Sequence, residues 1–225
     1  MRRLATTAVA VLLLAALVPS ASASPPATRG VLPPQAQVHG QSLTDIGAAF
    51  MYWNWSTPVA TNPLATGKCE PMPGQPRIWF LPQTLGDHPT WTCDDVPEGV
   101  FLVVSPYTVE CSNVEDPPFY GADAAEQRAC ADAAYALVTS MSVTVDGRAA
   151  TGLDGYAVAT PYTRLPDENL LTDLLGLPPQ ETWTTGRGVF LVLAPLSPGS
   201  HVVTTDAFVD AWGWTAGMTY EITVR

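Results

Sequence analysis

The chain has 225 residues, of which 47% are hydrophobic, and it carries a formal net charge of −11. Nucleic acids and anionic membranes are bound through clustered Lys and Arg, so this acidic balance argues against both as partners. The length is sufficient for one domain with a substantial hydrophobic core.

The N-terminus has the pattern of a secretory signal peptide at residues 1–23. Arg2 and Arg3 precede an apolar run at residues 8–18, and small residues end the pattern at Ala23. A retained membrane anchor is the alternative, but the run is about 11 residues long and a spanning helix needs roughly 20. No later run is long enough to span a bilayer. The sequence therefore predicts a secreted, extracellular protein that leaves the membrane after cleavage.

All four cysteines lie between Cys69 and Cys130, and in an exported chain they predict two disulfides. Four cysteines allow three pairings. We favour Cys69–Cys93 and Cys111–Cys130, because these cysteines are nearest neighbours in the sequence. A zinc site is the alternative, but the C-x2-C spacing of such sites is absent and the three histidines are scattered.

The first part of the mature chain divides into a lead-in and a helix. Residues 24–41 are rich in Pro, Ala and Gln, which predicts a flexible lead-in. Ser42 is a suitable N-cap, and apolar residues then recur at helical spacing over residues 43–55. This helix is too apolar to be stable when exposed to water on all sides, so we expect it to pack on a sheet.

Two continuous apolar runs, at residues 100–104 and 188–193, are typical of strands buried on both faces. Between them, Asp123 is expected to cap an amphipathic helix near residues 124–140. Cys130 lies in this helix, so the second disulfide would fasten the helix to the sheet.

The remaining segments complete a mainly β pattern. About seven short strands with Pro and Gly turns, one inserted amphipathic helix and a short N-terminal helix predict an antiparallel β-sandwich, stapled by the disulfides. This single domain would occupy residues 42–225. Two connections are long: residues 161–186, with a small helix at 168–175, and residues 208–217.

Several short motifs follow one another in the mature chain. They are YWNW at 52–55, NP at 62–63, GKC at 67–69, WFL at 79–81, C at 93 followed by VP at 96–97, EC at 110–111, PF at 118–119, VTVDG at 143–147, DEN at 167–169 and APLSPGSH at 194–201. In this order they resemble a family of exported bacterial proteins of actinobacterial type, whose function is unassigned. The resemblance covers nearly the whole mature chain. It implies one intact domain and both cysteine pairs, and it implies no reaction and no catalytic residue.

Asp167, Glu168 and Asn169 form an acidic cluster at the start of the first long connection. Their oxygens could bind calcium, which suits extracellular modules, but the D-x-D-x-D-G spacing of a defined calcium loop is absent. Solvated turn residues and helix N-terminal charges are the alternative interpretation. No cofactor other than calcium is a candidate.

A second acidic cluster surrounds Cys111 and consists of Glu110, Glu115 and Asp116. It offers the same oxygen ligands and lacks the same spacing. Glu110 also has a structural alternative, because it could form an ion pair with Arg128 on the helix that Cys130 would tether.

Trp212 and Trp214 are the aromatic pair that best suits a ligand. In an extended chain both indoles would project from one face, where a ligand such as a sugar ring could stack; core packing is the alternative. With Trp183, they predict a ligand-binding surface where the connection at 161–186 meets the loop at 208–217.

No motif in the sequence defines a reaction. A G-x-S-x-G elbow, a phosphate loop and a recognisable Ser, His and acid order are all absent. We therefore predict a non-catalytic extracellular binding module whose ligand is unknown, carbohydrate being one candidate. The first alternative is a secreted hydrolase that acts on glycans through two facing carboxylates. The second is a structural or envelope-interaction protein with an exposed apolar patch.

Overall fold

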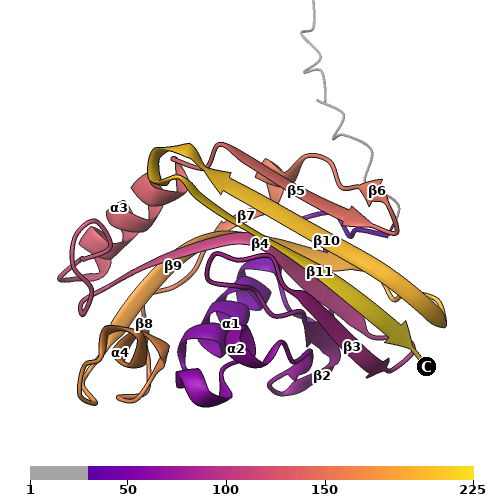
Figure 1. Ribbon diagram of the computed structural model, residues 1–225, viewed down its shortest axis with the longest axis horizontal. Coiled ribbons are helices and arrows are strands. Elements are labelled where there is room, and N and C mark those ends of the chain that lie inside the picture. Colours follow the sequence, from indigo (N-terminus) through magenta and orange to yellow (C-terminus); the bar gives the residue numbers. More distant parts are fainter. Residues whose placement is uncertain (1–29) are drawn as a thin grey trace, which may run out of the picture.

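Two β-sheets and several helices build the protein across residues 30–225, the part of the chain that the computed structural model describes. The predicted signal peptide at residues 1–23 lies outside the described residues. The sheets pack on each other, so the predicted mainly β, sandwich-like fold with inserted helices is confirmed (Figure 1).

The first sheet has the strand order β1-β2-β4-β9-β7, and β8 also pairs with β9. Its strands are β1 (Glu70–Met72), β2 (Gln75–Phe80), β4 (Phe101–Ser112), β7 (Ala157–Ala159), β8 (Thr163–Arg164) and β9 (Trp183–Leu193). Strand β2 runs parallel to β4, and the other pairs are antiparallel.

The second sheet has the order β3-β11-β10-β5-β6. Its strands are β3 (Thr90–Val96), β5 (Ser140–Val145), β6 (Arg148–Ala149), β10 (Gly199–Val209) and β11 (Trp214–Val224). Strand β3 runs parallel to β11, and the other pairs are antiparallel.

Both sheets are therefore mixed, whereas the sequence predicts antiparallel pairing throughout. The difference arises because the chain leaves the first sheet after β2, adds β3 to the second sheet and returns as β4 in the direction of β2. A local hydrophobic pattern shows that a strand is buried, but it does not show which sheet the strand joins.

Several strands are longer than predicted. Strand β4 has 12 residues because it continues through Ser105 and Pro106. The pairing with β9 is irregular there, with a register shift between Val104 and Tyr107. Residues 208–217, predicted as a loop, are mostly the ends of β10 and β11, joined by the short 3-10 helix η3 (Asp210–Trp212).

The two main helices begin where the sequence predicts. Helix α1 (Leu43–Trp55) is capped by Ser42, whose hydroxyl accepts from the Asp45 amide at 3.2 Å. Helix α3 (Ala124–Tyr135) is capped by Asp123 but ends before residue 140. It ends early because the Thr139 amide already donates to the Phe208 carbonyl of the second sheet at 2.8 Å.

The short helices lie in the connections. They are η1 (Val59–Thr61), α2 (Pro63–Thr66), η2 (Leu153–Tyr156) and α4 (Leu170–Leu175). In residues 30–225, none of the helices combines the length and the apolar character that crossing a membrane requires.

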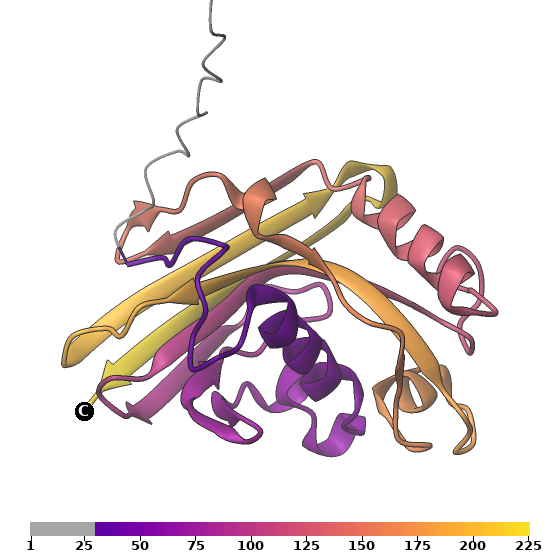
Figure 2. The same cartoon turned by 180° about the vertical axis from the view of Figure 1, so that it is seen from behind.

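The first sheet is the middle layer of the fold. Helix α1 covers one of its faces and the second sheet covers the other, as the two opposite views show (Figures 1 and 2). Phe50 of α1 packs edge-on against Phe80 and Phe190 of the sheet. Because both faces of β4 are covered, ten of its 12 residues are buried.

Part of the predicted flexible lead-in is ordered against the first sheet. Val31 is buried and forms a bridge with Leu193, and the Leu32 amide donates to the Val192 carbonyl at 2.8 Å. Composition alone predicts a flexible lead-in, but backbone pairing with β9 and two buried valines place residues 30–41 against the sheet.

Both predicted disulfides are confirmed. Cys69–Cys93 joins the start of β1 to β3 and so links the two sheets, while Cys111–Cys130 joins β4 to α3. The second bridge fastens the helix to the strand that also forms the site described next.

Candidate functional site

A cavity lies beside an unpaired stretch of strand edge. The pairing of β2 with β4 covers only residues 101–103 of β4. In the described part of the chain, that edge of β4 has no strand neighbour from residue 104 until Ser112 forms a bridge with Tyr120. Pro106 suits this position, because proline has no N–H to offer a neighbouring strand.

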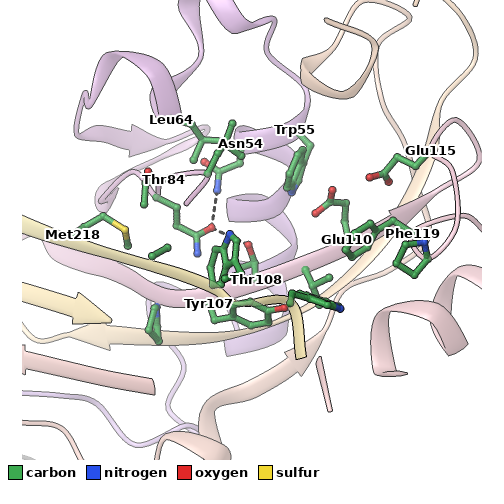
Figure 3. A pocket seen from close by; sticks show the side chains of 18 residues that line it. Asn54, Trp55, Leu64, Thr84, Tyr107, Thr108, Glu110, Glu115, Phe119 and Met218 are labelled. Carbon is green, nitrogen blue, oxygen red and sulfur yellow. Dashed lines mark hydrogen bonds between the residues drawn. The ribbon is translucent and has the colours of Figure 1, made fainter. Parts of the chain in front are cut away.

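The cavity beside this edge encloses about 500 Å³. Eighteen residues line it, contributed by α1, α2, the 83–85 loop, β4, the 115–119 loop, η3 and β11 (Figure 3). A volume of this size falls in the range of roughly 300–1,000 Å³ that is typical of small-molecule sites.

The wall nearest α1 is polar and connected by hydrogen bonds. Gln83 Nε2 donates to the carbonyl of Ser105 at 3.3 Å, which partly replaces the missing strand. Gln83 Oε1 accepts from Asn54 Nδ2 at 3.3 Å and from Thr108 Oγ1 at 2.9 Å. The amide of Gln83 therefore fixes Asn54 and Thr108 at the cavity wall.

Two buried polar atoms of α1 have no hydrogen-bond partner within residues 30–225. They are Asn54 Oδ1, an acceptor, and Trp55 Nε1, a donor. Asn54 is 1% exposed and Trp55 is 8% exposed, and both line the cavity. Buried polar atoms are rarely left unpaired because the loss costs about 1–3 kcal/mol each, so each of these atoms would be stabilised by a partner supplied at this wall.

The opposite wall is aromatic. Tyr107 contacts Trp214 edge-on, with ring centroids 5.5 Å apart, and Phe119 contacts Trp212 in the same way at 5.4 Å. Trp55 brings the number of aromatic side chains in the lining to five. Rings held in such pairs offer rigid apolar surfaces to a bound molecule.

Two carboxyl groups, those of Glu110 and Glu115, also line the cavity, and they point toward one another (Figure 3). Glu110 is 8% exposed, and among residues 30–225 no side chain forms a hydrogen bond or an ion pair with its carboxyl group; only its own backbone amide donates to it. Glu115 accepts from Ser112 Oγ at 2.8 Å. Alternation along β4 places Glu110 on the face opposite Cys111, and the turn after Ser112 brings Glu115 back beside it.

The surroundings favour the protonated forms of these carboxyls. Burial raises the pKa of Glu110 well above its ordinary value, and the nearby charge of Glu115 raises it further. Burial also raises the pKa of Glu115 to about 7, although hydrogen bonds from Ser112 oppose this shift. Of the described residues that line the cavity, none is Lys, Arg or His, so no protein cation balances the pair.

The predicted tryptophan site is only partly assembled. Trp212 and Trp214 line the cavity, and the other lining residues come from α1, β4 and the 115–119 loop among other segments, not from the connection at 161–186. Trp183 lies outside the lining and stacks on Tyr162, with centroids 4.7 Å apart. The connection at 161–186 therefore does not form the other wall.

Asp167, Glu168 and Asn169 have separate environments. Asp167 forms an ion pair with Arg164 at 2.7 Å. The buried Asn169 caps α4, where its Oδ1 accepts from the Leu171 amide at 2.9 Å. Glu168 is exposed. Residues 30–225 contain no group of three or more His, Cys, Asp or Glu placed to hold a metal.

The predicted ion pair between Glu110 and Arg128 does not form. Arg128 donates to the Gly186 carbonyl at 2.9 Å, to Thr185 Oγ1 at 2.6 Å and to the Thr160 carbonyl. Helix α3 lies on the Cys111 face of β4, so Glu110, which projects from the other face, cannot meet a side chain of α3.

A Ser, His and acid group lies at a turn of the second sheet. His201 Nδ1 is 2.8 Å from Asp146 Oδ2, and Nε2 is 3.4 Å from Ser197 Oγ. However, Nε2 is only 2.8 Å from the Ser197 carbonyl, which requires an N–H at that position. With both nitrogens donating, the ring is an imidazolium and cannot take a proton from Ser197. We assign this group to turn stability.

Several cavity residues were not predicted as site residues. Asn54 and Trp55 were assigned to a buried helix, and Tyr107 falls just after a predicted strand end. The available signal was the polar sequence after the apolar run of β4, where Thr108 and Glu110 alternate with Tyr107 and Val109. Such alternation indicates a strand with one unusual face.

Comparisons of the chain with models of known protein families, with curated proteins and with solved structures found no match. The site must therefore be interpreted from its own residues.

Proposed function

We propose that the protein is an exported binding module that holds a small organic molecule in the cavity beside β4. Export is supported by the signal-like pattern at residues 1–23 and by two disulfides, which persist in oxidising compartments. A ligand in the cavity would lie between the aromatic wall and the polar wall of α1.

The observation that carries this proposal is the pair of unpartnered buried atoms, Asn54 Oδ1 and Trp55 Nε1. One accepts and the other donates a hydrogen bond, and they lie on adjacent residues of one rigid helix. A molecule with a donor and an acceptor would satisfy both atoms while its apolar part contacts the rings.

Thr84→Trp tests the proposal, because Thr84 lines the cavity and a large side chain there fills it. We expect a thermal-shift screen of small polar molecules to find compounds that stabilise the unmodified protein and not this variant. Thr92→Trp is the matched control, since Thr92 is exposed on β3, outside the lining. Equal responses from both variants would contradict the proposal.

A glycan hydrolase is the second candidate, and the Glu110–Glu115 pair is the observation that favours it. A carboxyl group with a pKa of about 7, as at Glu115, suits general acid catalysis near neutral pH. Retaining and inverting glycosidases both use two facing carboxyl groups. Release of reducing sugar from a glycan panel, abolished in Glu115→Gln, would support this candidate; no release from any glycan would eliminate it.

A further inference from the structure

The charge of the cavity is not balanced by the protein. Glu110 and Glu115 face the same space, and of the described residues in the lining none is basic. Glu110 is more than nine-tenths buried, and no cationic side chain within residues 30–225 forms an ion pair with its carboxyl group. An ionised carboxylate in such a place is costly unless a positive charge is brought to it.

The walls around these carboxyls are also suited to a cation. Trp, Tyr and Phe rings attract cations through their electron-rich faces, and five such rings line the cavity. Asn54 Oδ1 adds an unpaired acceptor, which an N–H group of an amine or the hydroxyl group of choline could satisfy. A neutral sugar would use the rings and the amide but would bring no positive charge to the two carboxyl groups.

A bare metal ion fits less well. Calcium takes roughly six to eight oxygen ligands, whereas most residues of this lining are aromatic or aliphatic. The described residues offer no group of three or more metal-binding side chains. The volume of about 500 Å³ is also far larger than a single ion requires.

We infer that the ligand of this cavity is an organic cation, an amine or quaternary ammonium compound whose positive nitrogen lies between the two carboxylates and the aromatic rings. This inference rests on the proposed binding function and specifies its ligand class. The apolar part of the ligand would contact Tyr107 and Trp214, and the charged end would face Glu110 and Glu115.

Binding of a cation should release protons. The titratable side chains in the lining are Glu110, Glu115 and Tyr107, and burial raises the pKa of all three. A cation stabilises the ionised carboxylates and so lowers their pKa values. Affinity should therefore rise with pH through the region near 7, whereas a neutral ligand would show no such increase.

The test is calorimetric titration of the purified protein with choline and benzyltrimethylammonium at about pH 8, where the carboxyls ionise most readily. The uncharged isostere of choline, 3,3-dimethylbutan-1-ol, is the matched ligand control. We expect the cations to bind at least about tenfold more tightly than the alcohol. Repeating the titration in buffers of different ionisation enthalpy gives the number of protons released. We expect proton release when the cations bind and none when the alcohol binds.

Glu110→Gln should weaken choline binding about tenfold or more, because it removes the charge and keeps the shape. This variant is expected to fold, since it replaces a buried carboxyl that forms no ion pair with a neutral group of the same shape; Glu115→Gln provides an independent second variant. Glu98→Gln, at an exposed turn, is the control and should bind as the unmodified protein does.

The outcomes separate the inference from the proposed function. Equal or tighter binding of the alcohol, preferential binding of calcium, or binding of glucosides but not of cations would overturn the cation assignment and leave a ligand site in place. Failure of every probe, together with identical thermal-shift behaviour of Thr84→Trp and Thr92→Trp, would overturn both.

Discussion

The two halves of β4 perform different tasks. Residues 101–103 pair with β2, residues 102–104 pair with β9, and all four side chains are apolar, so this half of the strand belongs to the core. Residues 105–112 lose one neighbour where β2 ends, and their side chains include Thr108 and Glu110. A strand that extends beyond the end of its neighbour thus provides a rigid edge for a binding site, because the paired half holds the unpaired half in position.

The largest difference between the halves should be in how much a substitution lowers the stability of the protein. Leu102 is 1% exposed, and Leu102→Ala should lower the free energy of unfolding by about 3 kcal/mol because it leaves a cavity in the core. Thr108→Ala in the other half removes one hydrogen bond to Gln83 and should cost only about 1 kcal/mol. Urea denaturation measures both values. Equal losses would show that the two halves do not differ in this way.

The aromatic wall offers the next largest effect. Trp214 is half-buried against Tyr107, so Trp214→Ala should cost about 2 kcal/mol, whereas Trp212→Ala, at a side chain that is 37% exposed, should cost less than about 1 kcal/mol. Both should reduce binding of benzyltrimethylammonium. Trp183→Ala is the control, because Trp183 stacks on Tyr162 outside the cavity and its loss should leave binding unchanged. A core role for both indoles would instead give losses of about 3–5 kcal/mol in each variant.

The carboxyls make the unpaired half sensitive to pH. Because their pKa values in the folded protein exceed the ordinary value of 4.5, the folded state binds protons more tightly than the unfolded state. Stability should therefore fall as pH rises from 4.5 through about 7. Glu110→Gln should reduce this fall and stabilise the protein by about 1 kcal/mol above neutral pH. Melting temperatures recorded across this range give the result; a variant less stable at high pH would contradict the argument.

Sequence patterns were sufficient for much of the fold. The caps at Ser42 and Asp123 and the apolar run that begins β4 specify local structure, and nearest-neighbour spacing indicated both disulfides. These features depend on residues close together in the chain. The mixed sheets were not predicted, because pairing of β3 with β11 joins segments more than a hundred residues apart.

The candidate site depended on the same long-range pairing. Trp212 and Trp214 line the cavity, but their partner Tyr107 lies on a distant strand. Glu110 was noted as acidic, yet its burial follows from where β2 ends and how α1 packs. Neither fact is encoded in the residues adjacent to Glu110.

The smallest predicted effect concerns His201, a second group whose protonation changes stability with pH. Its contribution must be distinguished from that of the cavity carboxyls before the two halves of β4 are compared by titration. Burial lowers the pKa of His201, but hydrogen bonds to Asp146 and the Ser197 carbonyl outweigh this, so the pKa is raised above the ordinary 6.5. Protonated His201 therefore stabilises the folded state fully below pH 6.5. This stabilisation is lost as pH rises through the higher pKa that His201 has in the folded protein. Because Asp146 is 47% exposed, screening limits the effect to about 0.5 kcal/mol.

His201→Gln removes this contribution and keeps a hydrogen-bonding side chain at the turn. The variant should lose stability at acidic pH, match the unmodified protein at alkaline pH, and leave choline binding at the cavity unchanged. The double variant with Glu110→Gln should show the sum of the two separate pH profiles, because the groups lie in different sheets and share no partner. A clear departure from additivity would mean that the turn and the cavity are coupled through β10 and β11, and the unpaired edge of β4 would then not be the only determinant of the pH dependence of the cavity.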